Sequence, residues 1–144
     1  MTSGQTFTVG AVLTAHPHTV AHLRTLDVLP EIEAIHLHWL DGTDPAKLGP
    51  DVPLRKVIAT HDRLDAILSV QGLDAIVVCV RTDLCPDILR AAVEANVPIL
   101  FEKPGAVDAD TLWDVASAAR RRGVTVGTFL SWRGHPAVTQ VRDA

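Results

Sequence analysis

Short apolar runs recur along this chain, with room for a helix or a loop between one run and the next. The clearest run is Ala75–Val80, AIVVCV, which is rich in β-branched residues and has no polar residue, as is typical of a strand buried on both faces. Apolar runs predict strands at Phe7–Leu13, Ala34–Leu40, Ala75–Val80, Pro98–Glu102 and Val124–Leu130. A shorter extended piece is expected near Lys56–Ile58.

Segments with apolar residues at helical spacing separate most of these runs. Helices are predicted at Thr19–Val28, around Leu64–Leu68, from Pro86 through Val93, from Asp108 or Asp110 to Arg122, and from Pro136. Thr60 or His61 is expected to cap the second of these helices, and Gly123 follows the three arginines that end the fourth. Alternating strands and helices give repeated βαβ units. They predict an α/β fold, a Rossmann-like doubly wound parallel sheet in three αβα layers with right-handed crossovers.

Composition narrows the class of protein. A length of 144 residues suits a single domain over residues 1–144, and a hydrophobic content of 47% can supply its core. A net charge of −4 without a basic face argues against nucleic-acid binding. No run approaches the ~20 apolar residues of a membrane span. Met1–Gly4 lack a signal-peptide pattern, and Cys79 and Cys85 lack CxxC spacing, so we expect a cytoplasmic protein with free thiols.

The run that begins at Val97 ends abruptly in a carboxylate, an amine and a proline, Glu102, Lys103 and Pro104. Pro104 disfavours the helical region for Lys103 and keeps that residue extended. Open parallel sheets bind ligands in the crevice at the carboxyl ends of their strands, so Lys103 is expected at that crevice. An amine placed there can donate or accept a proton in catalysis. The alternative is a solvated turn lysine paired with Glu102.

The chain resembles the glucose–fructose oxidoreductase / inositol dehydrogenase / MocA (Gfo/Idh/MocA) family of NAD(P)-dependent oxidoreductases. The likeness lies in Leu73–Val78, Ala91–Pro104, Gly123–Gly127 and Trp132–Pro136. It covers essentially the whole chain but only the amino-terminal half of the family's members, so residues 1–144 would lack their second, substrate-binding domain. The resemblance implies NAD or NADP as the cofactor, and a small-molecule substrate with a hydroxyl or keto group on a sugar-like or polyol skeleton.

The resemblance also implies roles for individual residues. Lys103 would be the catalytic residue, lying beside the nicotinamide and handling the proton of the substrate hydroxyl. The acid that holds the ribose would be Asp41 or Asp44. The cofactor-binding residues implied in this way are Thr14, Ala15, His16, His18, Asp41, Arg81, Thr82, Glu102, Lys103 and Arg133.

The loop after the first strand departs from the family's pattern. A dinucleotide fingerprint needs glycines so that backbone amides can approach the pyrophosphate, whereas Leu13, Ala15 and His18 stand at about those places. Arg81 and Cys85 replace the proline and histidine that usually follow the fourth strand. Two hypotheses therefore stay open. The chain is the nucleotide-binding domain of an oxidoreductase, which alone would not shield hydride transfer from water, or it is a degenerate, non-catalytic domain that binds another ligand or a protein.

Two further questions concern assembly. In the family a second domain covers part of this sheet's edge. Its absence would expose apolar area, which self-association would cover, so we expect a homo-oligomer. The residues leave open whether the chain is a natural short protein or a piece of a longer enzyme.

Other polar residues suggest further chemistry. His16 and His18 follow the first strand, and His36 and His38 share one face of the second, so the four imidazoles could meet and bind zinc, copper or nickel. The alternative is that they are ordinary surface or helix-start residues. Arg81 could join Lys103 in binding an anion or could pair with Asp83 or Glu102. Cys85 has no histidine close in sequence to activate it as a nucleophile.

Overall fold

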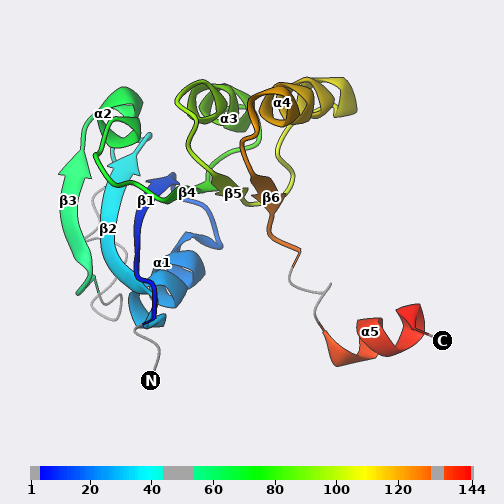
Figure 1. Ribbon diagram of the computed structural model, residues 1–144, viewed down its shortest axis with the longest axis horizontal. Helices are drawn as coiled ribbons and strands as arrows, with labels where there is room; N and C mark the ends of the chain where they lie inside the picture. Colours follow the sequence, from blue (N-terminus) through cyan, green and yellow to red (C-terminus); the bar gives the residue numbers. More distant parts are fainter. Residues whose placement is uncertain (1–3, 44–53, 131–134, 144) are drawn as a thin grey trace.

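A parallel sheet forms the centre of the molecule. The computed structural model describes residues 4–43, 54–130 and 135–143. Within these residues, six parallel strands form one sheet in the order β3-β2-β1-β4-β5-β6 (Figure 1). The strands are β1 (Phe7–Leu13), β2 (Ile32–Trp39), β3 (Val57–His61), β4 (Ala75–Cys79), β5 (Ile99–Phe101) and β6 (Val126–Thr128). The Rossmann-like α/β fold predicted from the sequence is confirmed. β2 and β3 are added on one side of β1, and β4, β5 and β6 are added on the other side, so the strand order changes direction at β1.

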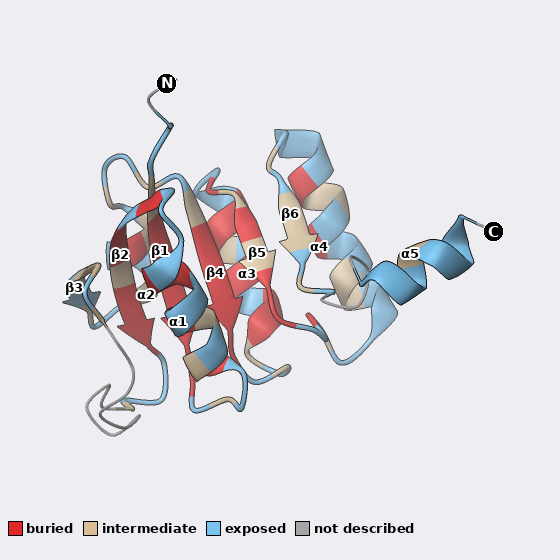
Figure 2. Cartoon of the chain, turned by 90° about the horizontal axis from the view of Figure 1, so that it is seen from below, coloured by how far each residue is buried: buried red, intermediate tan, exposed pale blue. Residues whose placement is uncertain are grey.

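Helices cover both faces of this sheet. α1 (Thr19–Val28) lies on one face, whereas α2 (Leu64–Leu68), α3 (Cys85–Glu94) and α4 (Ala109–Arg122) lie along the other (Figure 1). α5 (Pro136–Arg142) stands apart from these layers (Figure 1), and it has no buried residue (Figure 2). In the described residues, no helix is both long and apolar enough to cross a membrane.

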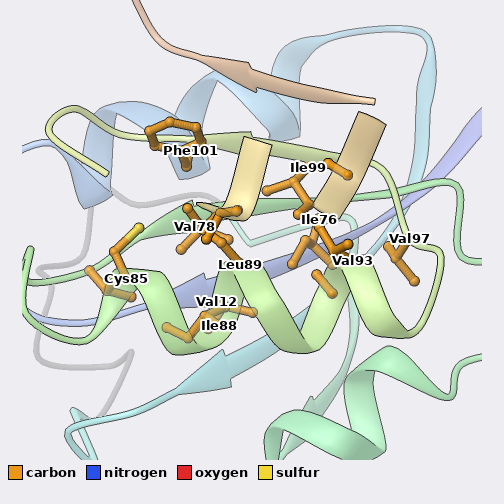
Figure 3. Close-up of a cluster of buried hydrophobic side chains, with 14 of the residues drawn as sticks. Val12, Ile76, Val78, Cys85, Ile88, Leu89, Val93, Val97, Ile99 and Phe101 are labelled. Carbon is orange, nitrogen blue, oxygen red and sulfur yellow. The ribbon is translucent and has the colours of Figure 1, made fainter. Parts of the chain in front are cut away.

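Side chains of the strands alternate between two apolar cores, because successive residues of a strand point to opposite faces. On the α1 side, Ile35, Leu37 and Trp39 of β2 pack with Leu23 and Leu26 of α1. The other core lies between α3 and the sheet (Figure 3). Its labelled members are Val12, Ile76, Val78, Cys85, Ile88, Leu89, Val93, Val97, Ile99 and Phe101.

The ends of α4 follow the sequence prediction. Of the two candidate caps, Asp108 is the one that accepts the N–H of Thr111, at 2.7 Å. Gly123 ends the helix in the left-handed region at φ 72°, which glycine adopts without steric cost.

The predicted cap of α2 was wrong. Thr60 and His61 belong to β3, because the β2–β3 ladder continues to the pair His38–His61. The N-cap of α2 is Arg63, whose side chain makes no capping hydrogen bond.

Candidate functional site

The polar residues predicted as a site follow the ends of four strands. Because all the strands are parallel, the loop after β1, the turn after β2, the turn after β4 and the Glu102–Lys103 pair after β5 lie at the same edge of the sheet. The switch point between β1 and β4 lies on that edge. Open α/β sheets bind ligands at such a point.

Glu102 is the buried acid of this edge, with its side chain 5% exposed. Its Oε2 lies 2.7 Å from His22 Nε2 and 3.3 Å from His18 Nδ1, and its Oε1 accepts the backbone N–H of Lys103 at 3.2 Å. Burial alone would raise the pKa of this carboxyl, but the hydrogen bonds from His22 and His18 outweigh burial and hold the pKa below its ordinary value. The ionised carboxylate therefore ties α1 to the end of β5.

Lys103 lies at the predicted edge of the sheet. Its side chain is 56% exposed, and its Nζ lies 3.6 Å from Glu102 Oε1. The lysine lies at the carboxyl ends of the strands, as predicted, and it also pairs with Glu102, which is the contact that the alternative described; its catalytic role stays a prediction. Beside it is a hollow of about 270 Å³ lined by His18, Ala21, His22, Glu102, Lys103 and Phe129.

Four backbone donors of the loop after β1 already have acceptors in the protein. The N–H of Thr14 bonds to Cys79 O, that of Ala15 to Asp41 Oδ2 at 2.7 Å, and that of His16 to Thr14 O. The N–H of His18 reaches His16 Nδ1 at 3.2 Å. These amides are therefore already paired, whereas a glycine-rich phosphate-binding loop offers its amides to the ligand.

The first turn of α1 keeps donors free. The side chain of the N-cap residue His18 makes no capping hydrogen bond. The N–H groups of Val20 and Ala21 have no acceptor among the described residues. Unpaired amides together with the positive end of the helix dipole make this turn suitable for an anion.

Asp41 connects this loop to the end of β2. Its carboxylate accepts the N–H groups of Ala15 and Thr43, at 2.7 and 3.0 Å. Burial would raise the pKa of Asp41, but its hydrogen bonds to Thr43 and Ala15 bring the pKa below the ordinary value. Trp39, Gly42 and Thr43 line a hollow of about 310 Å³ with the end of β3.

A family model matches residues 42–129, which is more than half of the chain; its description is an oxidoreductase family with an NAD-binding Rossmann fold. The chain belongs to this family. The match to the Gfo/Idh/MocA model begins at Gly42, beyond the loop after β1 in which the glycines are replaced.

Individual relatives agree with this assignment. The chain is 30% identical to the uncharacterized protein YMR315W of Saccharomyces cerevisiae, over 85% of the chain and 35% of the relative. It is 32% identical to the myo-inositol dehydrogenase Hyg17 of Streptomyces leeuwenhoekii, over 77% of the chain and 37% of the relative. The chain therefore spans little more than a third of these curated relatives. The structure of GenD2 from gentamicin A biosynthesis, in complex with NAD, has the same fold, with a TM-score of 0.80 and 19% identity over 96% of the chain and 38% of GenD2.

Two further residues implied by the Gfo/Idh/MocA resemblance, Arg81 and Thr82, lie in the turn after β4. Arg81 is 68% exposed and pairs with Asp83, Nε to Oδ1 at 3.0 Å, which was one of its two expected arrangements. This pairing raises the pKa of Arg81 and lowers that of Asp83. Thr82 lies half-buried in the same turn. Asp44 and Arg133 lie outside the described residues.

The two cysteines are buried and free, as the sequence predicts. Burial, with a smaller contribution from Cys79, raises the pKa of Cys85 to about 12. A thiol with so high a pKa is not ionised near neutral pH, which is typical of a buried structural cysteine.

His16, His18, His36 and His38, which the sequence allowed to meet, do not form one cluster. Since Ile35, Leu37 and Trp39 face α1, His36 and His38 point to the opposite face of β2, away from the loop that carries His16 and His18. His36 Nδ1 lies 2.9 Å from His61 Nε2, and burial and the charge of His61 lower the pKa of His36. In the described part of the chain, the group of three or more metal-ligating side chains is His18, His22 and Glu102 instead.

Sequence reasoning missed His22 and His61. His22 lies four residues after His18, so both rings project from the same side of the helix start. That spacing was the signal in the sequence that could have identified His22. The contact of His22 with Glu102, 80 residues away, has no signal in the sequence.

Proposed function

We propose that this chain binds NAD or NADP across the carboxyl edge of its sheet, as the nucleotide-binding domain of an oxidoreductase that acts on a hydroxyl or keto group of a polyol or sugar-like substrate. The single observation that carries the proposal is the position of Lys103. Its amine stands at the switch-point edge, beside a hollow, in a family whose description includes an NAD-binding Rossmann fold.

The residues of this edge fit a dinucleotide. Its phosphates would accept the free N–H groups of Val20 and Ala21 at the positive end of α1. The loop after β1, whose backbone donors are already paired, would contribute fewer donors than a glycine-rich loop does, so we expect modest affinity.

The two hollows fit an extended ligand. The carboxylate of Asp41 would accept a hydrogen bond from a ribose hydroxyl. Asp41 follows the end of β2, next to the hollow of about 310 Å³. The nicotinamide end would lie toward the hollow of about 270 Å³ that contains Lys103. The β1 loop and the start of α1, where the phosphates would bind, come between the two in the fold.

Lys103 would handle the proton of the reaction. When bound, the nicotinamide supplies or accepts the hydride. The Lys103 amine, exposed to the hollow, would take the proton from a substrate hydroxyl or return it to a carbonyl oxygen. Glu102 positions this amine, at 3.6 Å, through a carboxylate held by α1. The polyol assignment is supported by the relative Hyg17, a myo-inositol dehydrogenase.

The chain spans 35% to 37% of its curated relatives, so nucleotide binding is the property to measure on it, ahead of turnover. Calorimetry and thermal unfolding with NAD, NADH, NADP and NADPH test the proposal. A true site should stabilise the fold by about 2.7 kcal/mol at a hundredfold excess over Kd.

Asp41→Asn should weaken this binding. Asp87→Asn is the matched control, because that exposed acid lies on α3 and pairs only with Arg90 in the described residues. Absence of any shift at millimolar nucleotide would overturn the proposal and leave the non-catalytic domain as the better account.

A further inference from the structure

Three metal-ligating side chains converge on one side of the sheet edge. His18 and His22 come from the start of α1, one helical turn apart, and Glu102 comes from the end of β5. One ligand atom from each lies within 4.8 Å of the other two. The distances to Glu102 Oε2 are 3.3 Å from His18 Nδ1 and 2.7 Å from His22 Nε2.

This geometry is close to that of a bound transition metal. Zinc takes imidazole nitrogen and carboxylate oxygen at about 2.0–2.2 Å in a tetrahedral arrangement, which puts neighbouring ligand atoms roughly 3.4 Å apart. The His18–Glu102 separation already matches. The His22–Glu102 separation needs to open by less than about 1 Å, which a small rotation of either side chain provides.

The surroundings hold the three groups in place and leave one side open. Glu102 Oε1 accepts the N–H of Lys103 at 3.2 Å, so Oε2 is the oxygen turned toward the imidazoles. The ring of Phe129 packs against that of His22, with centroids 4.2 Å apart. All three ligand residues line the hollow of about 270 Å³, which leaves room for water or a ligand at the remaining coordination positions.

Neighbouring groups set the limits of the site. His16 is not among the ligand atoms that converge here, and its Nδ1 instead accepts the N–H of His18 and lies 3.4 Å from Cys79 Sγ. The ammonium of Lys103 lies 3.6 Å from Glu102 Oε1 and would repel a metal ion bound there, but the Lys103 side chain is exposed and can move away.

We propose that His18, His22 and Glu102 bind a divalent first-row transition ion of the zinc class, with its open positions facing the hollow. Two imidazoles and one carboxylate are a ligand set that such ions accept. The site borders the hollow in which the nicotinamide end of the dinucleotide is proposed to lie, but its three ligand side chains do not need a bound nucleotide, so metal binding and nucleotide binding are measured separately.

The test uses the whole chain without a histidine tag, first treated with a chelator that is then removed. Titration with Zn²⁺ by calorimetry, and with Co²⁺ by its visible absorption, should give one ion per chain. His22→Ala and Glu102→Gln should each weaken binding by about tenfold or more. Lys103→Gln should strengthen it, because a repelling charge is removed.

His36→Ala is the matched control, since His36 and His61 form a close imidazole pair outside the proposed site. Circular dichroism confirms that each variant is folded. The proposal is overturned if no ion binds, or if His36→Ala abolishes binding while His22→Ala leaves it unchanged. Nucleotide titration of the same samples separates failure of this site from failure of the proposed function.

Discussion

The loop that carries Lys103 is packed directly on an aromatic ring, which gives a sharp prediction for Gly105. A Cβ added at Gly105 would lie 2.3 Å from Phe101 Cε2, and Phe101 is 5% exposed. Carbon atoms in contact prefer about 3.5–4.0 Å, so the ring or the loop must shift by about 1 Å or more. Overpacking of this kind costs about 1–3 kcal/mol.

A smaller effect opposes this cost. Gly105 does not have a positive φ, so alanine can adopt its backbone conformation and gains about 0.4–1 kcal/mol from a less flexible unfolded chain. The net expectation for Gly105→Ala is a loss of about 1–2 kcal/mol in the free energy of unfolding. For a chain of this size, the melting temperature should fall by about 2–8 °C.

Urea and thermal unfolding followed by circular dichroism measure this loss, with two other glycines as references. A Cβ at Gly127 would lie 3.4 Å from Leu100 Cδ1, an ordinary contact, and Gly127 also lacks a positive φ, so Gly127→Ala should leave the free energy of unfolding unchanged or raise it by up to about 1 kcal/mol. A Cβ at Gly10 would lie 2.9 Å from Ile76 Cγ2, so Gly10→Ala should fall between the two.

The clash itself can be isolated by changing the ring. In a Phe101→Leu background, Gly105→Ala should cost less, because the crowded ring atoms are gone. Equal stability of Gly105→Ala and Gly127→Ala, or an equal cost of Gly105→Ala in both backgrounds, would refute the reasoning.

Three further predictions concern ionisable groups. The lowered pKa of Glu102 contributes stability that is present above its ordinary value of 4.5 and is lost as the pH falls through the folded pKa. The free energy of unfolding of Glu102→Gln should therefore fall less steeply with acid than that of the unchanged protein. An unchanged dependence on pH would contradict this. Cys85, with a pKa of about 12, and buried Cys79 should resist iodoacetamide at pH 8 until the chain is unfolded; rapid native alkylation would contradict their burial. Lys103→Ala should change the free energy of unfolding by less than about 0.5 kcal/mol, whereas a loss of several kcal/mol would identify a structural ion pair.

Much of the fold follows from local patterns in the sequence. The runs that became β1, β4 and β5 are apolar enough to be strands by themselves, and Asp108 and Gly123 mark the ends of α4 by their own side-chain and backbone chemistry. The predicted caps of α2 failed because pairing with β2 drew His61 into β3. Non-local pairing of that kind cannot be read from local propensity.

Part of the candidate site could likewise be predicted from the sequence, and part of it could not. That Lys103 and Asp41 would reach one edge of the sheet follows from parallel strands alone, because every carboxyl end then lies at that edge. Which imidazoles would meet does not follow. The face of β2 that carries His36 was fixed only when Ile35 and Leu37 packed against α1.

The sequence by itself determined the order of strands and helices along the chain, the family, and the place of Lys103 after β5. The tertiary structure alone decided that His22 of α1 reaches Glu102 of the loop after β5 at 2.7 Å, across 80 residues of chain. The physical reason is that strand and helix patterns are set by neighbouring residues, whereas the partner of a buried carboxylate depends on how a helix packs across the sheet.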